Sequence, residues 1–348
     1  MINGEDVAGL WTDNLPNKKL KWERTRAINL GIDFGLFKNR LNGSIDLYSN
    51  RTTDLILMRS LPNITGFSSI IANLGQVNNK GIEITLNSLN MDIPNKINWT
   101  TSFIYSTNNN KIRHLYGDMI DVKDKDGNVI GQREADDIQS GWYIGHGIHE
   151  IYDYKMIGIW QLGEEEAAKK YGKQPGDPKL LDVNEDGVMT EADKQFLGSK
   201  TPRYRMSLRN DFFLFNCLSV SFVLRGEFNY LSANNLGRND DNNYFDRANP
   251  LWADYWTPEN KSNEYARLGA DCSNPSVTFY KKRDYIRLQN ASIGYTFPKK
   301  LINKFSIQNL KVSLNIDNGF VITNWNYYDP ENTGTSPRIF TFGVDITL

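Results

Sequence analysis

The sequence predicts an all-β fold, an antiparallel up-and-down segment of a transmembrane β-barrel, and three observations support this class. Apolar and polar residues alternate along many short segments, which is the pattern of a strand with one apolar face. Short and long connections between these segments follow one another in strict alternation. The mean hydropathy is -0.53 and no apolar run approaches the roughly 18 residues of a membrane helix, so only strands could cross a membrane.

The first predicted hairpin covers residues 28 to 47. In RAINLGIDFGLF the even positions from Ile28 to Leu36 are apolar, whereas the odd positions from Asn29 to Gly35 are small or polar. After the short turn KNR, apolar residues at 41, 45 and 47 alternate with polar residues at 42, 44 and 46. A period of two on both sides of a short turn indicates two antiparallel strands.

The same alternation predicts further strands, about nine in all. Their apolar positions begin at Ile82, Ile97, Tyr204, Leu218, Ile286, Leu310 and Phe340. In DYIRLQNASIGYTF the apolar positions change from even to odd between Leu288 and Ala291, as one inserted residue would cause. We therefore expect a β-bulge near Gln289.

The connections between the predicted strands differ sharply in length. The turns FKNR, NMDIPNK, LFNC and PKKLINKFSIQN are short, and they alternate with long connections at about 50–76, 107–203, 229–280 and 317–338. This is the wiring of an outer-membrane barrel, with tight periplasmic turns, long extracellular loops and here a periplasmic C-terminus. A soluble β-sandwich or lipocalin-like barrel shares the strand pattern, but it would not usually gather connections this long on one side.

The face opposite the apolar one would line the interior of such a barrel. Its polar positions include Asp33, Glu83, Arg205, Arg209, Arg225 and Glu227. A charge is tolerated there because it faces away from lipid.

Composition excludes several other classes. The formal net charge is -1, so no broad basic field is present to hold a nucleic acid, and we expect no nucleic-acid partner. Two cysteines are too few for a disulfide framework or a cysteine-based zinc site. The N-terminal MINGEDVAGLWTDN has no basic region followed by an apolar core, so either the chain is cytoplasmic or its true beginning is missing.

Several segments taken together resemble one known family. They are LKWERTRAINLGIDFGLFKNRLNGSIDLYSNRTTDLIL, GFSSIIANLGQVNNKGIEITLNS, DVNEDGVMTEADKQFLGSKTPRYRMSLRNDF, YWTPENKSNEYARL, RDYIRLQNASIGYTFPKKL and RIFTFGVDITL. In this order, from about Leu20 to Leu348, they are similar to the C-terminal third of a SusC/RagA-type TonB-linked (TonB-dependent) outer-membrane protein. The resemblance places residues 1–348 in one incomplete barrel domain.

The resemblance implies a nutrient importer in the cell outer membrane. Such a protein is a 22-stranded barrel with an internal plug, and barrels of that size are plugged transporters. A SusD-like lipoprotein lid covers it, TonB supplies energy, and the substrate is an oligosaccharide or a peptide.

Parts of that family have no counterpart in this sequence. The signal peptide, the segment that contacts TonB, the plug and the early strands are missing, so Met1 is expected to begin a fragment that would reach TonB only through the missing N-terminal part. About nine strands cannot close a family-sized barrel, so we expect the first and last strands, near Leu30 and Val344, to be unpaired with each other. Leu348 departs from the family, which usually ends in an aromatic residue.

The stretch LDVNEDGVMTEADKQ within the 107–203 loop resembles an EF-hand loop at residues 182–193. Its metal ligands would be Asp182, Asn184, Asp186, the carbonyl of Val188 and Asp193, at loop positions one, three, five, seven and twelve. Hard oxygen ligands at this spacing suit Ca²⁺. An aspartate at position twelve reaches less far than the usual glutamate, and the prolines before the loop argue against a sensor. We expect a structural Ca²⁺ clip; the alternative is a metal-free Asp/Asn/Gly turn.

The long loops are also rich in aromatic residues. The candidates for substrate or partner contact are Trp142, Trp160, Trp252, Trp256 and Trp325. Such rings can stack on sugars, grip peptide side chains or pack against a lid protein. For each ring, packing within its own loop or anchoring at the membrane interface is the alternative.

No residue pattern predicts catalysis, so an enzyme is not expected. His146 and His149 in GHGIHE lack a helical context and a third ligand. The acidic pairs have no position that would support a glycosidase. Two functions therefore compete: part of an energy-coupled importer, and a soluble carbohydrate-binding or adhesion β-module.

Overall fold

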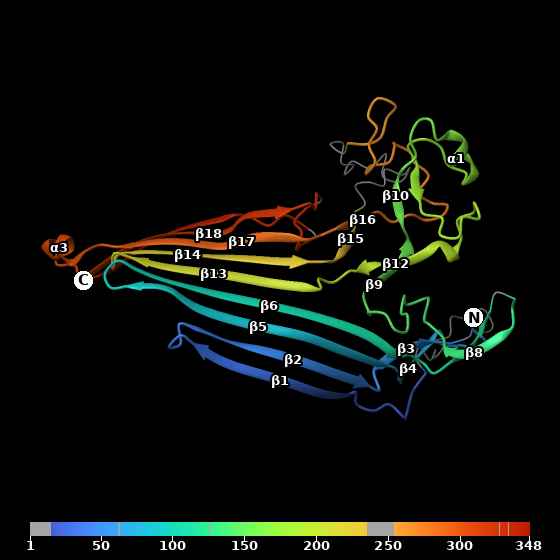
Figure 1. Cartoon of the computed structure of the whole chain (residues 1–348), viewed down its shortest axis with the longest axis horizontal. Helices are drawn as coiled ribbons and strands as arrows, with labels where there is room; N and C mark the ends of the chain where they lie inside the picture. Colours follow the sequence, from blue (N-terminus) through green and yellow to red (C-terminus); the bar gives the residue numbers. More distant parts are fainter. Residues whose placement is uncertain (1–14, 62, 125, 235–253, 327, 333) are drawn as a thin grey trace, which may run out of the picture. The chain divides into compact units, whose positions relative to one another are not determined.

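The computed structural model describes residues 15–61, 63–124, 126–234, 254–326, 328–332 and 334–348. Nine strands form one antiparallel sheet in the order β1-β2-β5-β6-β13-β14-β17-β18-β19 (Figure 1). Their bounds are β1 Arg24–Leu36, β2 Leu41–Thr53, β5 Gln76–Ile93, β6 Ile97–His114, β13 Tyr204–Leu214, β14 Leu218–Phe228, β17 Tyr285–Thr296, β18 Asn309–Thr323 and β19 Ile339–Thr347.

The order of the strands in the sheet follows their order in the chain, which confirms the up-and-down arrangement. β1 and β19 are its two edges, so in the described part of the chain the first and last strands are not paired with each other, as expected. No helix of the described residues is both long enough and apolar enough to cross a membrane.

The connections alternate in length as predicted. The short ones are residues 37–40, 94–96, 215–217 and 297–308, and the long ones are 54–75, 115–203, 229–284 and 324–338. Because successive connections in an up-and-down sheet lie at opposite ends of the strands, all the long ones leave from the same end.

The loop expected from residue 107 begins later, because β6 continues to His114. Its last residues, TNNNKIRH, are mostly polar on both faces, so no apolar alternation marks them as a strand. A strand that extends beyond the hydrocarbon layer has no need of an apolar face.

The chain forms two compact units. Unit 1 comprises Met1–Leu30, Leu47–Gly81 and Asn108–Ile148, and unit 2 comprises Gly31–Asp46, Ile82–Thr107 and His149–Leu348.

Unit 1 contains two small hairpins within the long connections. One joins β3 (Ile56–Ser60) to β4 (Ser69–Asn73), and the other joins β7 (Met119–Lys123) to β8 (Val129–Glu134). The short 3₁₀ helix η1 covers Asn63–Thr65. The core of this unit is formed by Val77, Ile112 and Leu115.

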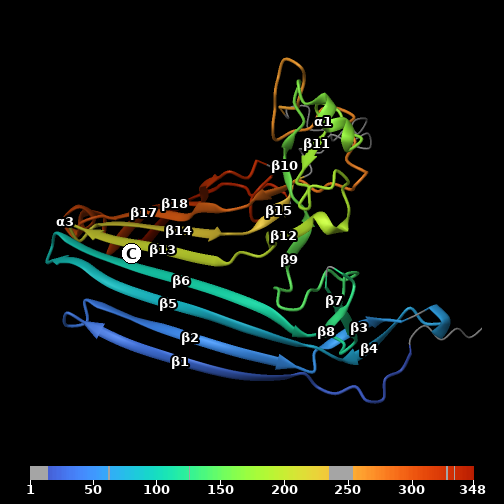
Figure 2. The same ribbon diagram turned by 45° about the vertical axis from the view of Figure 1, so that its right-hand side comes forward.

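Unit 2 carries the larger set of loop elements. Three strand pairs are β9 (Glu150–Tyr154) with β12 (Lys194–Ser199), β10 (Met156–Ile159) with β11 (Pro178–Leu180), and β15 (Leu231–Ala233) with β16 (Tyr280–Lys282). The helices are α1 (Glu165–Lys170), η2 (Glu191–Asp193), α3 (Lys299–Ile302) and η4 (Asn303–Phe305). Within this unit, α3 lies at one end of β13, β14, β17 and β18, and α1 lies beyond the other end (Figures 1 and 2).

The strand registers of unit 2 align the apolar positions into one continuous face. Leu208 on β13 lies opposite Phe103 on β6 and Leu224 on β14. The apolar pairs continue as Val220 with Ile293, Ile293 with Leu314, and Leu314 with Phe342. Phe340 and Phe342 are 65% and 68% exposed, so this face is not sealed in a protein core. An exposed apolar face of this extent suits contact with lipid rather than water, and it argues against the soluble β-module.

Aromatic side chains mark both ends of the apolar face. Trp99 stacks on Phe212 with ring centroids 5.3 Å apart, near the short turns. Tyr105 and Tyr204, 6.4 Å apart, lie near the long loops. The eight steps from Tyr204 to Phe212 span about 27 Å along an antiparallel strand and about 20 Å across the membrane at the usual tilt, close to the apolar band of an outer-membrane barrel.

Asn210 interrupts this apolar face, and the sequence pattern did not account for it. Its Oδ1 accepts hydrogen bonds from Trp99 Nε1 at 2.9 Å and from Thr101 Oγ1 at 2.7 Å. A polar group in hydrocarbon is costly unless it is hydrogen-bonded, so these two donors make the asparagine tolerable.

The predicted bulge in β17 is confirmed. Against β14, Leu288 and Asn290 pair with the adjacent residues Leu224 and Val223, so Gln289 is the inserted residue. The register against β18 also shifts between Leu288 and Asn290. The bulge transfers the apolar positions from even to odd numbers and keeps them on one face.

A charge on the apolar face should block assembly in the membrane. We expect Leu314→Arg to lower membrane insertion strongly, because an arginine facing mid-bilayer lipid costs about 2–4 kcal/mol. Asn315→Arg is the matched control, because Asn315 is the next residue of β18 and pairs with Ser292 and Thr341 on the polar face. Heat-modifiable folded protein in the outer-membrane fraction is the measurement; equal insertion of both variants would contradict the assignment of faces.

Candidate functional site

The polar face of the sheet in unit 2 carries charged pairs. Arg205 lies opposite Glu227, with 3.3 Å between Nε and Oε1. Arg209 Nε donates to Asp211 Oδ2 at 2.8 Å. Asp33 and Glu83, which were also predicted to line the interior, belong to β1 and β5.

Arg225 on β14 and Arg287 on β17 are direct partners in the register. Two like charges opposite each other destabilise a sheet unless they are neutralised. Two carboxylates of the 324–338 loop, those of Asp329 and Glu331, neutralise the two arginines. Arg287 Nη2 donates to both carboxylate oxygens of Asp329 at 2.7 and 2.6 Å, and Glu331 pairs with both arginines. The side chain of Arg287 is only 5% exposed, so these ion pairs hold the loop firmly on the strands.

Trp325 contributes to the same attachment. Its ring is buried, and the guanidinium of Arg283 lies 5.3 Å from the ring centroid. Arg283 Nη2 also donates to the carbonyl of Asn332 at 3.2 Å. Trp325 therefore packs its own loop against the start of β17.

The other long loops of unit 2 have a core of their own. Buried together are Ile159, Trp256, Ala266, Ala270, Cys272, Val277 and Phe279. Trp256 Nε1 donates to Gln161 Oε1 at 3.0 Å. Trp160 is also buried, with its ring 6.0 Å from Tyr171 and Lys179 Nζ 4.3 Å from its centroid. Trp256 therefore connects loop 254–284 to loop 149–203, whereas these contacts of Trp160 lie within loop 149–203.

Two ion pairs reinforce this loop core. Arg267 Nε donates to Asp177 Oδ1 at 2.9 Å, and Lys173 Nζ donates to Asp271 Oδ2 at 2.6 Å. The side chains of Asp177 and Lys173 are each 3% exposed. Burial raises the pKa of Asp271, but the hydrogen bond and charge of Lys173 and the backbone hydrogen bonds from Ser273 and Asn274 together outweigh it and hold that pKa below its usual range.

Two of the predicted contact tryptophans lie elsewhere. Trp142 is in unit 1, half-buried against the core cluster there, and its backbone pairs with Asp137. Trp252 lies outside the described residues. Of the four described rings, Trp160, Trp256 and Trp325 are covered by protein, so any contact between them and a substrate stays a prediction.

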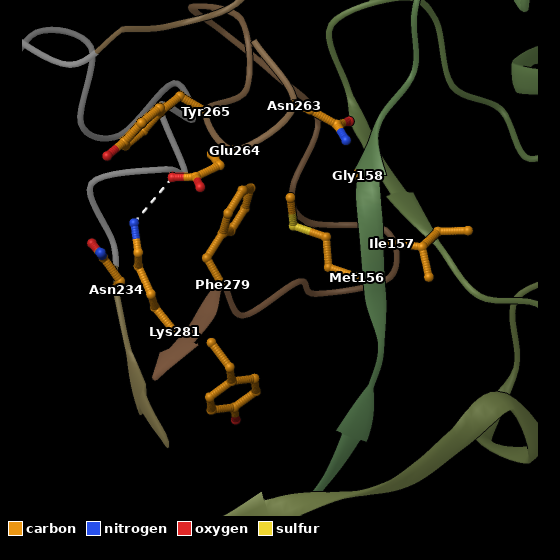
Figure 3. A pocket seen from close by; sticks show the side chains of 10 residues that line it. Met156, Ile157, Gly158, Asn234, Asn263, Glu264, Tyr265, Phe279 and Lys281 are labelled. Atoms are coloured by element: carbon orange, nitrogen blue, oxygen red, sulfur yellow. Dashed lines mark hydrogen bonds and ion pairs between the residues drawn. The ribbon is translucent and has the colours of Figure 1, made fainter. Parts of the chain in front are cut away.

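A cavity of about 270 Å³ lies between β10 and the segments around β15 and β16. It is lined by Met156, Ile157, Gly158, Asn234, Asn263, Glu264, Tyr265, Phe279, Tyr280 and Lys281. Figure 3 shows Met156 and Phe279 facing the same space. Glu264 and Lys281 form an ion pair beside Phe279, with 3.0 Å between Oε2 and Nζ.

Gly158 fixes one wall of this cavity. Asn263 Oδ1 accepts a hydrogen bond from the backbone of Ile159 at 2.8 Å. A Cβ added at Gly158 would lie 2.4 Å from that same oxygen, and the φ of Gly158 is +148°. Only glycine therefore allows Asn263 to approach β10 this closely.

The five residues predicted to bind calcium lie in one loop. Asp182 accepts hydrogen bonds from the backbone of Glu185 at 2.7 Å and of Gly187 at 2.9 Å, and from Tyr171 Oη at 3.0 Å. Asn184 Nδ2 donates to Asp186 Oδ2 at 2.8 Å.

Asp193 instead closes the loop from the opposite end. It is fully buried, and it accepts from the backbone of Val183 at 3.0 Å and of Thr190 at 2.8 Å. The five predicted ligands thus lie in one short loop, but their oxygens bond to the loop itself, and Asp182, Asp186 and Asp193 do not converge into a group suited to a metal ion. Calcium binding stays a prediction.

The histidines are dispersed over the two units. His114 Nδ1 lies 3.2 Å from Glu134 Oε2 in unit 1. The backbone of His146 pairs with Ile112, and the carbonyl of His149 accepts from Lys200. Across the described ranges, no three or more His, Cys, Asp or Glu side chains form a group suited to a metal ion.

Sequence reasoning missed the clamp made by Asp329 and Glu331 and the cavity beside Phe279. Both combine residues from separate connections, and neither follows a period that could mark it. The one usable signal for the clamp was the pair of acidic residues flanking Pro330, in a loop whose one other charged residue is Arg338.

Comparison with known proteins identifies related sequences. Residues 3–318 match the family described as TonB dependent receptor-like, beta-barrel. TonB-dependent receptor P3 of Formosa agariphila is 30% identical over 338 residues, which is 95% of this chain and 33% of the relative. TonB-dependent receptor SusC of Bacteroides thetaiotaomicron is 25% identical over 350 residues, 95% of this chain and 32% of the relative. The chain therefore spans about a third of the length of these curated relatives.

Solved structures share the fold. The RagAB peptide transporter superposes with a TM-score of 0.70 at 21% sequence identity, covering 98% of this chain and 37% of the other. At this identity the similarity concerns the fold alone.

The loop core should loosen in acid. Because the pKa of Asp271 is lowered in the folded protein, its carboxylate contributes stability above the unfolded pKa of about 4, and this contribution is lost as the pH falls through the lower folded pKa. We expect pepsin to begin cutting loop 254–284 as the pH is lowered from 4 to 2. Asp271→Asn should be cut at pH 4 already, and Glu166→Ala, on the exposed face of α1, should behave as wild type. Identical digestion of Asp271→Asn and wild type at every pH would contradict the role of this pair.

Proposed function

Because the chain belongs to the TonB dependent receptor-like, beta-barrel family, we propose that it is part of an outer-membrane importer for oligosaccharides or peptides. Its relatives are receptors of the outer membrane, and this chain is an outer-membrane protein. The proposed role is transport without covalent chemistry.

The observation that carries the proposal is the two-sided sheet. One face presents an apolar surface from β6 to β19 that is interrupted at Asn210, and the other presents charged pairs such as Arg205 with Glu227. A wall with lipid on one side and a polar passage on the other has this pattern. The loop attached by Asp329 and Glu331 would then form a fixed part of the passage, because its ion pairs are on the polar face.

The partners follow from the relatives. One relative is named SusC and one structural neighbour is a RagAB peptide transporter. We extend to this chain the import of peptides or oligosaccharides, a SusD-like lipoprotein lid over the long loops, and energy coupling through TonB outside the present sequence. Within unit 2, the long connections leave from one end of the sheet, which is the end that such a lid would cover.

Uptake by cells that carry the complete protein tests this function. Deletion of its gene should abolish uptake of the labelled oligosaccharide or peptide that supports growth. Deletion of TonB should have the same effect, because in the proposed mechanism the plug leaves the barrel only when TonB supplies energy. Diffusion of a small solute through porins is the control and should be unchanged. Uptake that persists without TonB would contradict energy-coupled import.

We further propose that the 182–193 loop binds one structural Ca²⁺. The support is that Asp182, Asn184 and Asp186 occupy one short loop, with the Val188 carbonyl and Asp193 at the remaining positions. Tyr171 Oη is 3.0 Å from Asp182 Oδ2, so a Tb³⁺ ion in the loop would be excited through that ring.

Terbium luminescence therefore tests the calcium proposal. The complete protein in detergent should sensitise Tb³⁺, and Ca²⁺ should compete for the site. Asp186→Ala should lose the signal at least tenfold, whereas Glu166→Ala should keep it. A signal that is absent in the wild type, or unchanged in Asp186→Ala, would leave the loop as a metal-free turn.

A further inference from the structure

The cavity between Met156 and Phe279 combines an apolar floor with a charged rim. We propose that it is a peptide subsite, which holds one apolar side chain against Met156 and Phe279 while Glu264 and Lys281 pair with the charged or polar groups of the peptide beside it. This inference rests on the proposed import function and narrows its substrate class to peptides.

The floor is rigid on one side and adaptable on the other. Phe279 belongs to the buried loop core, and its carbonyl accepts a hydrogen bond from the backbone of Asn234 at 2.7 Å. Met156 lies on β10 opposite the ring and packs partly against the same core (Figure 3). A methionine has an unbranched, polarizable side chain that adjusts to differently shaped partners, so this floor suits apolar side chains of several kinds.

The rim offers one charge of each sign. Glu264 and Lys281 form an ion pair at 3.0 Å, and the side chain of Glu264 is 66% exposed. An ion pair this exposed contributes little to stability, so its two groups can exchange partners at small cost. A peptide carries donors, acceptors and terminal charges that match both groups, whereas a neutral sugar matches neither charge.

The remaining polar groups of the wall are already engaged. Asn263 Oδ1 accepts from Ile159, and Asn234 Nδ2 donates to Asn326 at 2.8 Å. Tyr280 Oη donates to Asp153 at 3.0 Å, and Asn326 contacts the hydroxyl of Tyr265.

A sugar would find little to bind here. A sugar site needs open aromatic faces and several amides or hydroxyls that can reach the ligand. The amides and hydroxyls of Asn234, Asn263, Tyr265 and Tyr280 already bond to other protein groups, so few remain to bind a sugar. The wall therefore favours a peptide over an oligosaccharide.

The volume sets the length of ligand that fits. About 270 Å³ is close to the lower limit of small-molecule pockets. It has room for one large side chain with its flanking backbone, and a longer peptide would extend beyond it. The cavity is thus a single subsite for one residue of a peptide.

The test is binding to the complete protein purified in detergent. A pool of tryptic casein peptides is applied, bound peptides are identified by mass spectrometry, and the affinity of the most enriched peptide is measured by calorimetry; maltoheptaose is the sugar probe. Met156→Trp fills the cavity, and Lys281→Ala removes one charge of the rim. Leu162→Trp is the matched control, because Leu162 is exposed in the loop that follows β10 and lies outside the cavity.

We expect the wild type and Leu162→Trp to bind the peptide equally, and Met156→Trp and Lys281→Ala each to weaken binding at least tenfold with unchanged folding by circular dichroism. Lys281→Ala keeps the test decisive if Met156→Trp misfolds. Peptide binding that is unchanged in both cavity variants would overturn the subsite, and binding of maltoheptaose without peptides would overturn the substrate class. Neither result would affect TonB-dependent uptake in cells, so failure of this inference is distinguishable from failure of the importer proposal.

Discussion

The pairing of apolar with apolar residues across neighbouring strands is the constraint on which the rest of this structure depends. In unit 2 every register from β6 to β19 places its apolar positions on one face. Because side chains alternate with a period of two, a slip of one residue would transfer a whole strand's apolar set to the polar face. At Gln289 the bulge accommodates one extra residue in β17, so the apolar residues on both sides of it lie on the same apolar face.

The same registers place two positive charges opposite each other on the polar face, and the loop between β18 and β19 neutralises them. Arg225 and Arg287 are brought into direct opposition by the pairing of β14 with β17. Asp329 and Glu331 neutralise them, and because the side chains of Arg287 and Asp329 are buried, the loss of one partner would leave a buried charge without compensation. The position of this loop is therefore a consequence of strand register. The loop covers the part of the polar face around Arg225 and Arg287.

The long connections of unit 2 gain order from a core of their own rather than from the sheet. The ring of Trp256 packs loop 254–284 against loop 149–203, and Trp160 is buried within loop 149–203. Asp177 and Lys173 join the same two loops through ion pairs in which their own side chains are buried. The cavity beside Phe279 lies at the border of this core. Such a division suits a transporter, because a rigid wall can carry a separately built surface for recognition.

The sequence by itself determined the nine strands of the sheet, the alternation of short and long connections and the bulge near Gln289. These features are local, since a period of two and its single shift can be read along one strand. Only the tertiary structure decided which side chains meet across connections: Arg225 with Glu331, 106 residues apart, Lys173 with Asp271, 98 apart, and Met156 with Phe279 around one cavity. The side chains of a strand alternate between a lipid-facing and a polar face, and this alternation gives its sequence a period of two. Loop residues have no such alternation, so their sequence has no repeating pattern. Their contacts are therefore fixed only when the strands bring distant parts of the chain together.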